Sequence, residues 1–114
     1  MSFEVIVTGP FERKLKRLVK KYPSLGKELA IVIAELSDNP TLGTPLGKDC
    51  YKIRIAITSK GKGKSGGARM ITFARIIKNT VYLMDIYDKS EQANISHKEL
   101  QELIDILAAD NFRS

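Results

Sequence analysis

The spacing of apolar residues changes once along this chain, from the period of a helix to the period of a strand. Between residues 11 and 36 apolar side chains recur at helical spacing, in two stretches that Pro23 separates. From Tyr51 onward they alternate with polar side chains, as in strands that bury one face. The chain is therefore predicted to form a helical hairpin followed by a sheet, which is an α+β arrangement.

Turn and capping residues around these stretches set the expected element boundaries. We expect a strand over 3–7, helices over 10–22 and 24–39, a loop over 41–48, strands over 51–58, 68–77 and 81–87, and a C-terminal helix after the capping-box sequence 96–99. The helical hairpin should pack on one face of a small, mainly antiparallel sheet. No repeat or long linker divides the 114 residues, which indicates one domain over 1–114.

Positive charge is concentrated in the middle of the chain. Residues 47–78 contain nine lysines and arginines but one acidic residue, within a protein of net charge +6. So many like charges favour a polyanionic partner, and nucleic acid is the commonest of these. The alternative is a solvated, lysine-rich loop over 59–67 that binds nothing.

The cations are expected to gather on one open face of the sheet. Alternation places two of them on one strand and two on the next, with three more in the loop between, and the seven are Lys52, Arg54, Lys60, Lys62, Lys64, Arg69 and Arg75. Such a face suits a phosphodiester backbone, and neighbouring cations disfavour the protonated form of a lysine, which could then act as a general base. The alternative is a set of solvent-facing cations without a ligand.

Several classes of catalytic site are excluded or disfavoured by composition. Cys50 and His97 are the only cysteine and histidine, which excludes an internal disulfide, a thiolate zinc cluster and paired catalytic histidines. The one acidic cluster is Asp85, Asp88 and Glu91, of which we expect Asp88 and Glu91 to be surface turn and cap residues. We therefore expect neither a metal nor another cofactor.

The amino terminus bears on the compartment. Residues 1–8 place an acidic residue and a short apolar stretch where a signal peptide has a basic region and a longer apolar one. No apolar run approaches the ~20 residues of a membrane span. We expect a cytoplasmic protein.

Three short motifs resemble a known family. The segments 49–55 (DCYKIRI), 67–71 (GARMI) and 81–91 (VYLMDIYDKSE) are similar to those of the RelE/ParE superfamily of bacterial toxin–antitoxin modules. The glycine- and lysine-rich loop 59–67 and the added C-terminal helix look closest to the HigB-like branch. The resemblance implies a toxin that cleaves mRNA in the ribosomal A site without a metal and that a co-encoded antitoxin neutralises.

The resemblance also implies roles for individual residues. Lys52 and Arg54 match the family's basic pair, Arg69 matches the arginine that contacts the scissile phosphate, and Lys89 lies near a basic position after the last strand. The family's C-terminal tyrosine has no counterpart in Asn94–His97. Tyr87 is the first candidate to replace it, and His97 is the second.

These observations leave three functional hypotheses. The first is a ribosome-dependent endoribonuclease, in which Lys52 or Lys60 helps to deprotonate the ribose 2′-hydroxyl, Arg54 and Arg69 stabilise the phosphoryl charge, and Tyr87 or Lys89 orients the base or protonates the leaving oxygen. Its partners would be the ribosome, mRNA and an antitoxin. The second is a ParE-like inhibitor of DNA gyrase that cuts nothing, and the third is an inactive RNA-binding relative.

Overall fold

The protein folds as two helices, a five-stranded sheet and a third helix. A computed structural model describes residues 2–60 and 66–111. The elements are β1 (Glu4–Val7), α1 (Gly9–Lys21), α2 (Leu25–Asp38), β2 (Thr44–Gly47), β3 (Cys50–Ile55), β4 (Ala68–Arg75), β5 (Thr80–Asp88) and α3 (His97–Asn111). Within the described ranges, no helix has both the length and the apolar character needed to cross a membrane.

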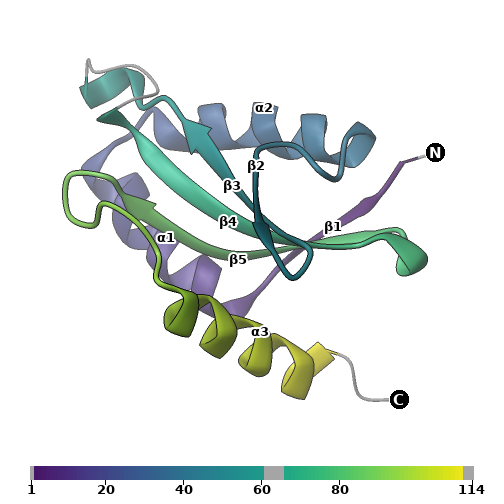
Figure 1. Ribbon diagram of the computed structural model, residues 1–114. Coiled ribbons are helices and arrows are strands. Elements are labelled where there is room, and N and C mark those ends of the chain that lie inside the picture. Colours follow the sequence, from purple (N-terminus) through teal and green to yellow (C-terminus); the bar gives the residue numbers. More distant parts are fainter. Residues whose placement is uncertain (1, 61–65, 112–114) are drawn as a thin grey trace.

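The sheet is mixed, with the strand order β1-β5-β4-β3-β2. β1 lies parallel to β5, and every other neighbouring pair is antiparallel. The helical hairpin of α1 and α2 covers one face, and α3 lies against the other face (Figure 1). The expected α+β fold with a mainly antiparallel sheet is thus confirmed.

Two hydrophobic cores form on the two faces of this sheet. The larger core joins Phe11, Leu18, Leu25, Leu29 and Leu36 of the hairpin to inward-facing residues of β3, β4 and β5. The smaller core joins Leu100 and Leu107 of α3 to the opposite face, which includes Cys50, Ile71, Tyr82, Met84 and Tyr87. The expectation of an open basic face is therefore wrong in part, because α3 covers much of that face.

The segment expected as a loop over 41–48 contains an additional strand. Thr44–Gly47 forms β2, which pairs with β3 through a tight turn in which Lys48 and Asp49 have positive φ. Proline and glycine in this segment suggested a loop, but an edge strand tolerates proline because one side of it needs no ladder hydrogen bond. The first residue of β2, Thr44, lies opposite Lys52, so β2 pairs with only the first half of β3.

Helices α2 and α3 each begin after a serine, but only one of the two serines caps its helix. Ser96 and Glu99 exchange side-chain-to-backbone hydrogen bonds of 3.1 and 3.2 Å, which is the capping box predicted for α3. Ser24 occupies the N-cap position of α2 but makes no capping hydrogen bond. Its hydroxyl instead lies 2.8 Å from Glu28 Oε1 and accepts from the backbone N–H of Ser59, which ties α2 to the segment after β3.

A buried carboxylate fixes the end of β5 to α1. Asp88 is 1% exposed and accepts hydrogen bonds from Lys60 Nζ and Tyr22 Oη, each at 2.6 Å, and from the hydroxyl and N–H of Ser90. Burial alone would raise the pKa of Asp88, but these hydrogen bonds, the one from Lys60 foremost, together hold it well below its usual range. The expectation that Asp88 is a surface turn residue is wrong.

We predict that Asp88→Asn destabilises the fold by about 3 to 5 kcal/mol, because Lys60 then keeps a buried charge without its counter-ion. Because folding depresses the pKa of Asp88, its contribution to stability is present above the unfolded value near ~4 and is lost as the pH falls below it. Denaturant unfolding from pH 7 to pH 2.5 should therefore show a steeper acid loss for the wild type than for Asp88→Asn.

Glu91→Gln is the matched control for this prediction. Glu91 pairs with Lys21 at 3.3 Å, but its side chain is 56% exposed, so its loss should change stability by less than ~1 kcal/mol. Equal destabilisation by the two substitutions would contradict the assigned role of Asp88.

Candidate functional site

Three predicted site residues line up across the central strands. Arg54 of β3 lies directly opposite Arg69 of β4, and Arg69 lies directly opposite Tyr87 of β5. Residues that face each other in an antiparallel ladder project from the same side of the sheet. Arg54, Arg69 and Tyr87 therefore share the face on which α3 packs, and we call these three residues the arginine–tyrosine row.

Arg69 is the buried member of the arginine–tyrosine row. It is 3% exposed, and its Nη1 donates to the carbonyl oxygen of Ala68 at 3.1 Å. Burial lowers the pKa of Arg69, as does the charge of Arg54, while Tyr87 acts in the opposite sense. Like charges directly opposite one another destabilise a sheet, so an anion bound beside both guanidinium groups would relieve this repulsion.

Tyr87 places a buried hydroxyl group on the same side of the sheet. Its side chain is 6% exposed, and its buried Oη has no hydrogen-bond partner among the residues that the structure describes. Burial raises the pKa of Tyr87; Arg69 opposes this effect, and the carboxylates of Asp85 and Glu99 reinforce it. Near neutral pH the group is thus a protonated phenol, which can donate to an oxyanion.

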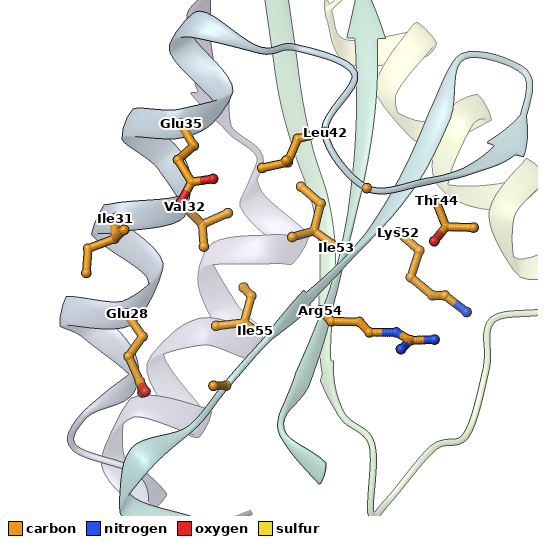
Figure 2. A pocket seen from close by; sticks show the side chains of 12 residues that line it. Glu28, Ile31, Val32, Glu35, Leu42, Thr44, Lys52, Ile53, Arg54 and Ile55 are labelled. Atoms are coloured by element: carbon orange, nitrogen blue, oxygen red, sulfur yellow. The ribbon is translucent and has the colours of Figure 1, made fainter. Parts of the chain in front are cut away.

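Lys52 extends the row along β3. It lies two residues before Arg54, and Figure 2 shows both side chains pointing to the same side of the strand. Its Nζ donates to Asn94 Oδ1 at 3.2 Å, which brings the segment between β5 and α3 against this cation. Asn94 is a neighbour that sequence reasoning missed, because the contact spans 42 residues.

Lys60 lies away from the arginine–tyrosine row, whereas Lys89 follows Tyr87 by two residues. Lys60 is bound to Asp88, which follows Tyr87 and therefore points to the opposite face, toward Tyr22, the C-cap residue of α1. The ammonium group of Lys60 also lies 5.2 Å from the centre of the Tyr22 ring, at cation–π distance. The exposed Lys89 follows β5, and its N–H donates to the carbonyl oxygen of Gly67.

The remaining predicted residues either lie apart from the arginine–tyrosine row or fall outside the residues that the structure describes. Arg75 is six residues beyond Arg69 on β4, opposite Thr80, or about 20 Å away at the rise of an extended strand. Lys62 and Lys64 are outside the described residues. His97 is an exposed residue in the first turn of α3, as its position after the capping serine predicts.

The acidic cluster of the sequence does not converge in space. Asp85 pairs with Lys14 at 2.5 Å, Asp88 with Lys60, and Glu91 with Lys21. In the part of the chain that the structure describes, no group of three acidic, cysteine or histidine residues is placed to hold a metal ion. The structure thus groups cations and a phenol on the α3 face, whereas each of the three carboxylates pairs with a different lysine.

Comparison with known proteins agrees with this architecture. A family model described as the RelE toxin of the RelE/RelB toxin–antitoxin system matches residues 11–112. A mutant of the E. coli toxin RelE in the free state is 14% identical, with a TM-score of 0.63 over 94% of this chain and 99% of that chain. The isolated E. coli RelE toxin is 16% identical, with a TM-score of 0.59 over 93% and 100%.

At these identities the two solved structures establish a common fold, including the mixed sheet and the C-terminal helix. The family model carries the further step, because it spans nearly the whole chain, from the first turns of α1 to the end of α3. This protein therefore belongs to the RelE toxin family of type II toxin–antitoxin systems.

Proposed function

We propose that the protein is a ribosome-dependent mRNA endoribonuclease that inhibits translation in the cytoplasm. The observation that supports this most directly is the arginine–tyrosine row, in which a buried arginine faces a second arginine and a protonated phenol. Two guanidinium groups and a hydroxyl on one face are suited to a phosphodiester that gains negative charge during cleavage. Membership of the RelE family points to the same substrate class.

The reaction proposed is an internal transesterification of the RNA. The ribose 2′-oxygen attacks the adjacent phosphorus and forms a new O–P bond, while the bond from phosphorus to the 5′-oxygen of the next nucleotide breaks. The products are a 2′,3′-cyclic phosphate and a free 5′-hydroxyl. No water, metal or redox partner enters this step, so the protein has to supply orientation, charge stabilisation and two proton transfers.

Each group of the site has a place in that step. Lys52 assists the removal of the proton from the 2′-hydroxyl, since Lys60 is already engaged by Asp88. Arg54 and Arg69 bind the non-bridging phosphoryl oxygens, and a planar guanidinium can hold two oxygens at once. Tyr87 donates its proton to the leaving 5′-oxygen, and Lys89 is the alternative donor.

Placement in the HigB-like branch of the family belongs to this proposal. It rests on the glycine- and lysine-rich sequence of residues 59–67, because the C-terminal helix is part of the fold shared with RelE. The proposed partners are a co-encoded antitoxin, the ribosome and its mRNA. The concentration of positive charge in residues 47–78 supports the ribosomal partner, because phosphate contacts supply most non-specific affinity for nucleic acid.

We predict that expression of the protein alone stops growth and that co-expression of its antitoxin restores it. Protein synthesis, followed by pulse labelling, should stop before DNA synthesis does, because the proposed target is mRNA on the ribosome. Normal growth at a verified level of folded protein would contradict the toxin assignment. An earlier stop in DNA synthesis would favour the gyrase inhibitor instead.

We predict that Arg69→Ala lowers the single-turnover rate of cleavage on ribosomes by roughly 100- to 1000-fold, the scale of losing one transition-state donor. Ribosome binding should fall much less, because the other cations remain. Arg75→Ala removes the same charge from the same strand about 20 Å away and should cost less than about tenfold. Thermal melting of both variants shows whether each is folded.

Equal losses of cleavage in Arg69→Ala and Arg75→Ala would mean that bulk charge alone matters. That result would contradict the assignment of Arg69 to the scissile phosphate. Arg69→Lys separates charge from geometry, because it keeps the cation but removes the planar fork, and it should recover only part of the lost rate.

A further inference from the structure

A groove of about 700 Å³ runs between α2 and the outer edge of β3. Its apolar lining comes from Ile31 and Val32 of α2, Leu42, and Ile53 and Ile55 of β3. In Figure 2, Ile53 and Ile55 point toward α2, whereas Lys52 and Arg54 point to the other side of the strand. Ile31 is 63% exposed, so this wall of the groove is open to solvent as well as apolar.

The edge of β3 beside this groove is without a neighbouring strand. β2 pairs with β3 only as far as Lys52, opposite Thr44. A Cβ added at Gly43 would lie 2.5 Å from the carbonyl oxygen of Lys52, so that carbonyl faces the outer edge. Peptide groups alternate in direction along a strand, which turns those of Arg54 and Ala56 to the same edge. No strand of the described chain pairs with them there.

A strand added at this edge would reach both surfaces of the sheet at once. Its side chains would alternate, with every second one entering the groove beside Ile53 and Ile55 and the others lying over Lys52 and Arg54. The groove is complementary to apolar side chains, and the two cations are complementary to carboxylates. The surface is therefore complementary to an extended segment of alternating apolar and acidic residues.

We propose that the antitoxin of this module adds such a segment to the free edge of β3. The inference rests on the antitoxin partner of the proposed function and adds the place and the chemistry of the contact. Carboxylates over Lys52 and Arg54 would occupy two cations that the mRNA phosphate needs. Strand addition thus inhibits the toxin by covering the proposed site from its edge.

Charge in the groove favours a peptide over RNA as its occupant. Glu28 and Glu35 of α2 line the groove and would repel a phosphate backbone. Glu28 already accepts from the N–H and the hydroxyl of Thr58, at 2.8 and 2.6 Å. RNA also offers no backbone ladder to pair with the peptide groups of Arg54 and Ala56, whereas an extended peptide does.

The first test replaces the exposed apolar wall of the groove. Ile31→Asp should weaken binding of the full-length product of the reading frame next to the toxin gene by roughly 30-fold or more, as expected when a buried anchor of an interface is lost. Ile77→Asp is the matched control, because Ile77 is 85% exposed after β4 and lies outside the groove. Binding is measured by calorimetry, with melting temperature and ribosomal cleavage measured for each variant.

The second test reads the strand edge directly. Hydrogen exchange of the Arg54 and Ala56 amides, followed by NMR in the free toxin and in the complex, should slow on binding if these groups enter a ladder. Equal binding by wild type and Ile31→Asp, or unchanged exchange at both amides, would overturn the proposal.

Other outcomes separate this proposal from the proposed function. If the wild type binds no product of a flanking reading frame, the docking proposal falls, while cleavage of mRNA on ribosomes is decided by its own assay. A toxin dimer that Ile31→Asp dissociates would place a second copy of this chain at the edge and would also overturn the proposal. Tight docking with no cleavage would remove the nuclease and leave the docking surface standing.

Discussion

The juxtaposition of Arg54 and Arg69 across the β3–β4 ladder is the constraint on which the functional account depends. A pairing of like charges costs free energy in any sheet, and here Arg69 is also almost fully removed from water. The arrangement costs less when an anion lies beside it. In the proposed reaction that anion is a phosphodiester, whose charge grows during cleavage, so the repulsion between the two arginines would favour the transition state over the ground state.

The two faces of the sheet separate the larger core from the arginine–tyrosine row. On the hairpin face, aliphatic side chains of α1 and α2 form the larger core, and the Asp88 cluster holds the last residues of β5 against α1. On the α3 face the smaller core includes Tyr87, and the arginine–tyrosine row lies toward one end of the strands. Tyr87 and Asp88 are consecutive residues of β5 whose side chains point to opposite faces. The hydrogen bonds that hold Asp88 therefore also position Tyr87.

Much of this architecture follows from local patterns that the sequence carries. The period change from helix to strand, the proline between the helices and the capping box at Ser96 predict most elements, because each depends on residues close in the chain. The placement of Lys52, Arg54 and Arg69 on one face of the sheet follows from side-chain alternation in two adjacent strands. The family resemblance then connects these cations to a phosphate, and the family model confirms the family.

What escaped prediction depends on contacts between distant residues. Nothing local shows that Lys60 would turn toward Asp88, 28 residues later, or that Asn94 would reach Lys52. Asp88 looked like a surface turn residue because aspartate commonly is one, and its burial arises only when α1 brings Tyr22 to it. β2 was missed because its proline and glycine are typical of a loop. They are compatible with an edge strand once β3 lies beside them to pair with.

The most direct test is primer extension on one mRNA, with and without ribosomes translating it, in the presence of enough chelator to remove loosely bound divalent ions but not to dissociate the ribosomes. The account predicts cuts within the translated region only when ribosomes are present, with cyclic phosphate and 5′-hydroxyl ends and with no loss of rate in chelator. Equally fast cutting of naked RNA, or cutting that the chelator abolishes on intact ribosomes, would contradict it.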